Sequence, residues 1–113
     1  MSSAAAQIGL ANHEAIAAAK GGIISLVKSA ATTYSGKNIR VNAIAPGLTD
    51  TPMTAKIFAN ENSLKVSQKM HALPRLGAIE DQVSAIKFLI NPDNSCVAGQ
   101  NIAVDGGLGT LKK

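Results

Sequence analysis

Aromatic residues and cysteine are scarce in this sequence, and each shortage narrows what the protein can be. There is no Trp, one Tyr and two Phe among 113 residues, so a core must be built from Ala, Val, Ile and Leu. Burial of apolar surface contributes about 25 cal/mol per Å², and small side chains bury little of it. We therefore expect such a core to need a partner surface. The single Cys96 excludes an intramolecular disulfide and, beside two isolated His, indicates no metal site and a reducing, cytoplasmic setting.

The sequence also lacks the charge and hydropathy patterns of nucleic-acid-binding and membrane proteins. Its 11 Lys and Arg outnumber 7 Asp and Glu, but they are scattered, with no run longer than two and no aromatic residues between them. We therefore expect no nucleic-acid partner. The longest apolar stretch, over 15–31, is interrupted by Lys20, Gly21, Gly22 and Lys28, so no membrane span is expected. No basic segment precedes an apolar stretch near Met1, so no signal peptide is expected.

Hydrophobic periodicity predicts an alternation of helices and short strands. A long helix is predicted over 15–33, with Asn12 as its N-cap and Gly36 as its C-terminal glycine. A buried strand over 38–45 ends at Pro46-Gly47, and a polar, helix-prone stretch follows to about His71. An amphipathic helix over 80–90 and a last strand over 101–104 complete the chain. The apolar side of that helix is predicted to hold Val83, Ile86, Leu89 and Ile90. This order is typical of the α/β class with crossover connections on a parallel sheet.

Four motifs in one order resemble the C-terminal half of the short-chain dehydrogenase/reductase family. They are AAAKGG at 17–22, IRVNAIAPG at 39–47 followed by TDTPM at 49–53, PRLG at 74–77, and GQNIAVDGG at 99–107. The resemblance implies the C-terminal portion of a doubly wound parallel Rossmann-type sheet. Residues 1–113 would form a single partial Rossmann-type domain, from the catalytic helix to the last strand. A complete dinucleotide-binding domain needs roughly twice this length, so the N-terminal cofactor half would be missing and the protein truncated.

The resemblance implies two catalytic residues and shows one departure. Lys20 stands where the family has its catalytic lysine, and Ser3 has the spacing of the serine that polarises the carbonyl. The family's tyrosine, four residues before the lysine, is Ile16 here, and an alkyl group cannot exchange a proton. Tyr34 lies 18 residues further on, about 27 Å away at ~1.5 Å per residue, which excludes it as a substitute. His13 is on roughly the same face as Ile16 and could transfer a proton, although it could equally be a surface or capping residue.

The resemblance also implies NAD or NADP as cofactor. The residues implied for cofactor binding are Lys20, Pro46, Gly47, Leu48, Thr49 and Thr51. Gly47 permits close backbone approach, although an ordinary turn with an N-cap Thr would give the same pattern. No glycine-rich phosphate-binding fingerprint is present, so this chain alone is expected to bind NAD(P) weakly or not at all.

Two interpretations of function remain open at this stage. The first is an NAD(P)-dependent oxidoreductase acting on small alcohols or carbonyls, truncated and impaired. The second is a non-catalytic oligomerisation or scaffold module, and Ile16 favours it, whereas Lys20 and Thr51 favour the first. Because its helix over 15–33 is apolar on most sides, a homo-oligomer through that helix is expected. Asp105 is interpreted as structural, and Cys96 and His71 are given no site role. The substrate and the choice of NAD or NADP are not predicted.

Overall fold

The computed structural model describes residues 1–112, and its secondary structure alternates helices with two short strands. The longer helices are α1 (Glu14–Tyr34), α3 (Glu61–Met70) and α4 (Ile79–Ile90), and α2 (Ala55–Ala59) is a short one. The strands are β1 (Ala43–Pro46) and β2 (Asn101–Val104). Three 3₁₀ turns, η1 (Ala4–Ala6), η2 (Ser35–Lys37) and η3 (Pro92–Asn94), lie before α1, after α1 and after α4.

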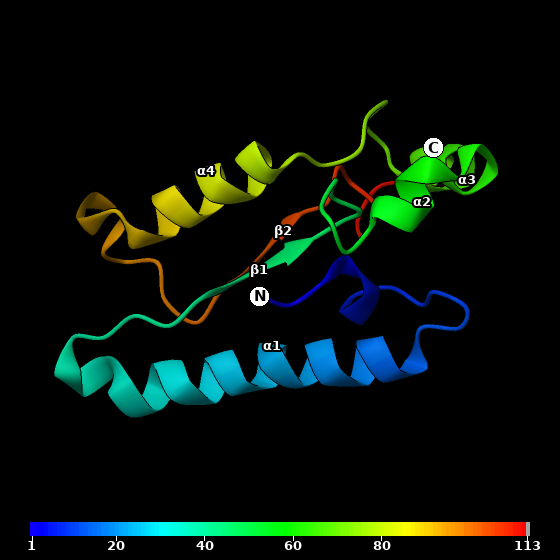
Figure 1. Ribbon diagram of the computed structural model, residues 1–113. Coiled ribbons are helices and arrows are strands. Elements are labelled where there is room, and N and C mark those ends of the chain that lie inside the picture. The colour runs from blue at the N-terminus through cyan, green and yellow to red at the C-terminus, as the bar shows by residue number, and fades with distance from the viewer. Residues whose placement is uncertain (113) are drawn as a thin grey trace.

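The two strands form a parallel sheet that lies between α1 and α4 (Figure 1). Ala43 is opposite Asn101 and Pro46 is opposite Val104. The residues before η1 follow the other edge of β1, because the Ser2 N–H donates to the Ile44 carbonyl oxygen at 2.8 Å. Helices α2 and α3 lie beyond the carboxyl ends of the strands (Figure 1). This arrangement confirms the predicted α/β class, with a parallel sheet and helices on both faces.

The core is small and is centred on β1. Ala43, Ile44 and Ala45 are buried, as are Val27 on α1 and Leu89 on α4. The radius of gyration is 15.1 Å, whereas a compact domain of 100 residues has about 13 Å. Large apolar side chains are consequently exposed on α1 and α4. They include Ile16, Leu26, Ile79, Val83, Ile86, Phe88 and Ile90.

The ends of α1 differ from the prediction. The N-cap is His13 and not Asn12, which adopts a positive φ of 61° in the preceding turn. At the other end, α1 passes into η2, and the left-handed residue that ends the helical segment is Asn38, with φ 57°. Gly36 was predicted for that role, but Asn also tolerates the left-handed region, so the chain turns two residues later.

The predicted strand over 38–45 was too long, because β1 begins only at Ala43. Ahead of it, side chains add to a backbone hydrogen bond from the Gly99 N–H to the Val41 carbonyl oxygen at 2.9 Å: Asn42 donates to the Val97 carbonyl oxygen at 2.9 Å and accepts from the Gln100 N–H at 2.9 Å. Arg40 also donates to the Val97 carbonyl oxygen, at 3.0 Å. The segment is therefore extended without being a strand.

The predicted apolar side of α4 was wrong in its rotation about the helix axis. Gln82 and Leu89 are buried, whereas Val83, Ile86 and Ile90 are exposed. The amide of Gln82 reaches two acceptors on the sheet side, which holds this face of the helix inward. Within residues 1–112, no helix is long and apolar enough to cross a membrane.

Candidate functional site

Five of the predicted site residues lie at or just after the carboxyl end of β1: Pro46, Gly47, Leu48, Thr49 and Thr51. Pro46 ends β1 there, and the Gly47 N–H donates to the Val104 carbonyl oxygen at 3.2 Å. Ser3 directly follows Ser2, which is hydrogen-bonded to β1 at Ile44. The carboxyl edge of an open α/β sheet is where such folds bind their ligands.

Ser2 joins the strand edge to the helix that carries Lys20. Its hydroxyl donates to the Lys20 carbonyl oxygen at 3.0 Å, and its side chain is buried. Ser3 is the N-cap of η1, and its Oγ accepts from the Ala5 N–H at 3.2 Å. The Ser3 hydroxyl hydrogen has no acceptor among residues 1–112, so this group can donate to a ligand. Lys20 is half-buried, and its ammonium forms no ion pair within the described part of the chain.

The tyrosine position holds an alkyl side chain at the helix surface. Ile16 lies one turn before Lys20 on α1 and is 48% exposed. Tyr34 is the last residue of α1, at the end remote from Lys20. His13 places its Nδ1 2.8 Å from the Ala11 carbonyl oxygen, so Nδ1 carries the proton in this contact. The ring of His13 therefore belongs to the turn that starts α1, and its role in proton transfer stays a prediction.

The loop from Pro46 to Thr51 is held against the segment that precedes α4. The Gly77 N–H donates to the Leu48 carbonyl oxygen at 2.9 Å, and the Gly77 carbonyl oxygen accepts from the Asp50 N–H at 3.0 Å. The Thr49 hydroxyl donates to the Gly47 carbonyl oxygen at 3.2 Å and is buried. The backbone N–H groups of Leu48 and Thr49 take part in no hydrogen bond within residues 1–112.

Thr51 shares its hydroxyl contact with Thr54, a residue that sequence reasoning did not single out. The two Oγ1 atoms are 3.1 Å apart, and Thr54 Oγ1 also accepts from the Thr51 N–H at 3.0 Å. The Thr54 hydroxyl is 2.6 Å from the Thr49 carbonyl oxygen. The end of the loop is thus fixed by a threonine pair, and Thr51 keeps a lone pair available to a ligand.

A glycine is required at position 47 because neighbouring residues leave no room for a side chain. Its φ is not positive, but a Cβ at this position would lie 2.9 Å from both Asp105 Cα and His71 Nε2. The close approach expected of Gly47 therefore involves the end of β2 and His71. Asp105 has the predicted structural role, because its buried carboxylate accepts from the N–H groups of Gly107 at 2.9 Å and Gly109 at 2.8 Å.

Two buried polar side chains beside this loop were missed from the sequence. His71 is 2% exposed and contacts Gly47. Gln82 is 6% exposed, and its Nε2 donates to Thr49 Oγ1 at 3.3 Å and to the Val104 carbonyl oxygen at 3.2 Å. The one available signal for Gln82 was its helical spacing from Leu89, seven residues on, which puts both on one face.

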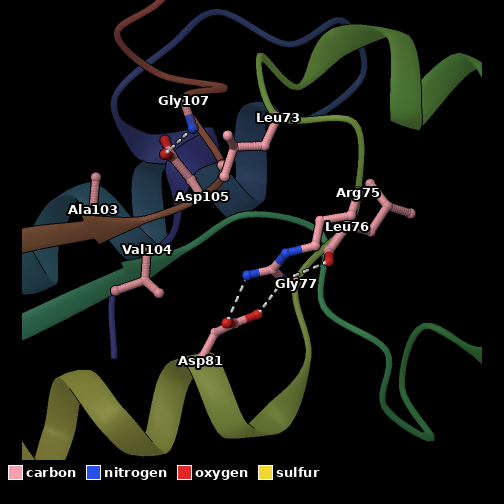
Figure 2. A pocket seen from close by; sticks show the side chains of 10 residues that line it. Leu73, Arg75, Leu76, Gly77, Asp81, Ala103, Val104, Asp105 and Gly107 are labelled. Atoms are coloured by element: carbon pink, nitrogen blue, oxygen red, sulfur yellow. Dashed lines mark hydrogen bonds and ion pairs between the residues drawn. The ribbon is translucent and has the colours of Figure 1, made fainter.

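A separate hollow of about 290 Å³ lies at the end of β2, and an ion pair occupies one wall (Figure 2). Arg75 donates to both carboxylate oxygens of Asp81, at 2.6 and 2.9 Å. This hydrogen bonding, followed by that from the Ala78 N–H, lowers the pKa of Asp81 to about 2. The hydrogen bond to Asp81 also raises the pKa of Arg75. None of the predicted site residues lines this hollow. Within residues 1–112, no three His, Cys, Asp or Glu side chains are grouped for a metal ion.

The hydrogen-bond donors described above suit the nicotinamide and ribose of a dinucleotide, and no glycine-rich loop for its phosphates is found in the sequence. The free Lys20 ammonium, the Ser3 hydroxyl and the two unpaired loop N–H groups are donors, as a ribose and a carboxamide require. A phosphate-binding glycine-rich loop before a helix is absent from the sequence.

Comparison with known proteins identifies the family. A family model described as enoyl-(acyl carrier protein) reductase matches residues 1–109. The chain is 40% identical over 107 residues to cis-4-hydroxycyclohexanecarboxylate dehydrogenase of Sinomonas cyclohexanicum, covering 95% of this chain and 42% of that protein. It is 42% identical over 92 residues to a 3-oxoacyl-(acyl-carrier-protein) reductase of Thermotoga maritima, covering 81% and 37%.

Solved structures agree with this result. A 4-hydroxyisoleucine dehydrogenase complexed with NADH superposes with a TM-score of 0.93 at 31% identity, covering 98% of this chain and 46% of that one. A short-chain dehydrogenase/reductase from Mycobacterium ulcerans gives 0.91 at 33% identity, covering 96% and 39%. The fold is a segment of a Rossmann-type α/β domain, and the chain belongs to the short-chain dehydrogenase/reductase family. It spans less than half the length of these relatives.

Proposed function

We propose that this chain is the nicotinamide-side part of an NAD(P)-dependent oxidoreductase for small alcohols or carbonyls, and that Ile16 impairs its catalysis. The observation that supports the proposal is that Ser2, the neighbour of Ser3, joins two elements: its hydroxyl donates to the Lys20 carbonyl oxygen on α1, and its N–H donates to Ile44 in the strand that leads into the Pro46–Thr51 loop. Residues 1–113 then form one partial Rossmann-type domain.

Each of these residues has a distinct task in the proposed site. When bound, NAD(P) supplies or accepts the hydride. The Lys20 ammonium binds the nicotinamide ribose, and the N–H groups of Leu48 and Thr49, with the Thr51 hydroxyl, orient the carboxamide. The Ser3 hydroxyl donates a hydrogen bond to the substrate oxygen, which polarises a carbonyl.

The missing function is proton transfer. Reduction of a carbonyl needs a group that delivers a proton to the substrate oxygen, and Ile16 cannot supply one. Loss of a general acid typically slows a reaction by ~10²–10⁴-fold. Two titratable side chains, His13 and Glu14, lie within one turn of Ile16 on its amino-terminal side. His13 is the candidate substitute for the missing proton donor, and a variant can test it.

A second candidate function is a non-catalytic oligomerisation or scaffold module. Ile16 favours it, and so does the surface of α1, where Ile16 and Leu26 are exposed while only Val27 is buried. A two-fold contact between two copies of α1 would bury this surface. We therefore propose a homo-oligomer under either function, and a cytoplasmic location because Cys96 is a free, exposed thiol.

A chimera separates the two functions. The matching C-terminal part of the Sinomonas cyclohexanicum dehydrogenase is replaced by this chain, and NADH and NADPH binding and carbonyl reduction are measured. We expect a chimera that binds cofactor but reduces substrate slowly, and an Ile16→Tyr variant that is faster by ~10²–10⁴-fold. A His13→Ala variant of the chimera tests the substitute proton donor.

The outcomes of this experiment are distinct. A folded chimera that binds no cofactor would refute the oxidoreductase proposal and favour the scaffold. If cofactor binds and the Ile16→Tyr variant is no faster, Ile16 is not the cause of impairment. Fast reduction that is lost in His13→Ala would assign proton transfer to His13.

A further inference from the structure

His71 is buried in one defined tautomer. It is the C-cap residue of α3 and is 2% exposed. Its Nδ1 lies 2.7 Å from the Ser67 carbonyl oxygen, and a carbonyl oxygen only accepts. The proton of the neutral ring is therefore on Nδ1, and Nε2 carries a lone pair.

The ring fits between two glycines of separate loops. A Cβ on Gly47 would lie 2.9 Å from His71 Nε2, and a Cβ on Gly106 would lie 3.4 Å from His71 Cδ2. The imidazole thus fills the space that these glycines leave at the start of the Pro46–Thr51 loop and at the turn after β2.

The Nε2 atom is buried and has no hydrogen-bond partner within residues 1–112. A buried acceptor without a donor destabilises the folded state, because its hydration is lost and not replaced. A leucine would fill a similar space without that loss. Packing alone therefore does not account for a histidine here, whereas the directed hydrogen bond to Ser67 distinguishes it from an alkyl side chain.

We propose that His71 is a positioning residue for the Pro46–Thr51 loop. Its hydrogen bond to Ser67 fixes the ring plane, and the ring fixes Gly47, which has no side chain of its own to restrict the loop. Gln82 holds the same loop from α4 through Thr49. Together they set the direction of the Leu48 and Thr49 N–H groups. The link to cofactor binding rests on the proposed function.

The test uses the full chain labelled with ¹⁵N and three variants. His71→Leu fills the space but cannot donate to Ser67, whereas the side-chain amide nitrogen of His71→Asn takes the place of Nδ1 and can donate. Gln68→Leu is the matched control, because it adds the same side chain to an exposed position of α3. Two quantities are measured by NMR: amide exchange at Gly47 and Asp50, and amide shifts on titration with reduced nicotinamide mononucleotide, the nicotinamide half of the cofactor.

We expect His71→Leu to raise exchange at Gly47 and Asp50 about tenfold while amides of α1 stay unchanged. We also expect it to weaken binding of the mononucleotide about fivefold, with recovery in His71→Asn to within about twofold of the parent chain. Gln68→Leu should match the parent in both measurements.

Three results would count against the proposal or separate it from the proposed function. Unchanged exchange and affinity in His71→Leu would overturn it. A uniform rise in exchange over α1, the sheet and the loop would assign His71 a general structural role, and this too would overturn it. If the folded chimera binds no cofactor, the proposed function fails, and loop exchange in the full chain with its recovery in His71→Asn still decides whether His71 positions the loop.

Discussion

Ser2 donates a hydrogen bond from its hydroxyl to the Lys20 carbonyl oxygen at 3.0 Å, and its backbone N–H donates to Ile44 at 2.8 Å. One buried residue therefore links α1 to β1. Ser3 follows Ser2 directly, so the position of the Ser3 backbone relative to Lys20 depends on the contacts of Ser2.

Replacing Ser2 by Ala should destabilise the fold measurably. The variant loses the side-chain hydrogen bond to α1 and keeps the backbone hydrogen bond to β1. We therefore expect the free energy of unfolding to fall by about 1 kcal/mol and Tm to fall by roughly 4–8 °C. Thermal unfolding followed by circular dichroism measures both. Ser3→Ala is the matched control, because its contact is confined to η1, and it should cost less. Equal Tm values for Ser2→Ala and the parent chain would contradict the link.

The isolated chain should bind NADH and NADPH weakly or not at all. The dinucleotide's pyrophosphate normally binds at a glycine-rich turn before a helix, and this sequence has none. Titration followed by nicotinamide fluorescence measures the affinity, with the 4-hydroxyisoleucine dehydrogenase that was solved with NADH as the positive control. Micromolar affinity of the 113-residue chain would show that this interpretation of the missing loop is wrong.

Light scattering should find a homo-oligomer and not a monomer of 11.5 kDa. Leu26 on α1 is 62% exposed, and an apolar surface of this kind is stabilised by burial. Leu26→Glu should dissociate the assembly, because it would place a carboxylate in the buried contact. Gln68→Glu on α3 is the control and should leave the mass unchanged. A folded monomer at low micromolar concentration would exclude the interface.

The sequence predicted those parts of the fold that depend on local pattern. The last strand was predicted with its observed bounds, and α1 and α4 to within one residue at each end. The errors have a tertiary cause. Asn42 and Arg40, in the part of the predicted strand that precedes β1, bond to Val97, more than 50 residues away. The spacing of apolar residues along a segment cannot predict a contact with a residue so far away in sequence.

The residues of the candidate site also fall into those that the sequence predicts and those that it does not. Lys20 and the Pro46–Thr51 loop were recognisable because short motifs carry them. His71 and Gln82 were not, because each is polar and gains its place beside the loop through contacts more than 20 residues away in sequence. Gly47 shows the same limit: it was predicted to permit close backbone approach to a nicotinamide, and its crowding by Asp105 and His71 became visible only in the structure.

The Arg75–Asp81 pair should make stability depend on pH in an acidic range. Asp81 accepts from Arg75 and from the Ala78 N–H at 2.8 Å, and its pKa is lowered from an ordinary 3.8 to about 2. A depressed carboxyl pKa stabilises the folded state above the unfolded value, and this contribution is lost as pH falls through the folded value. The Tm difference between the parent chain and Asp81→Asn should therefore be constant above about pH 5, shrink below about pH 4 and vanish below about pH 2.

The size and origin of this effect can be checked separately. Asp81 is close to solvent, so the difference should be small and should fall further in high salt. Because the Arg75 hydrogen bond is the main cause of the shift, Arg75→Gln should move the Asp81 titration, followed by carboxyl ¹³C NMR, back toward its ordinary range. The double variant should then lose little beyond either single variant, since the two residues act as one pair. An Asp81 midpoint near 4 in the parent chain would show that the pair does not form in solution.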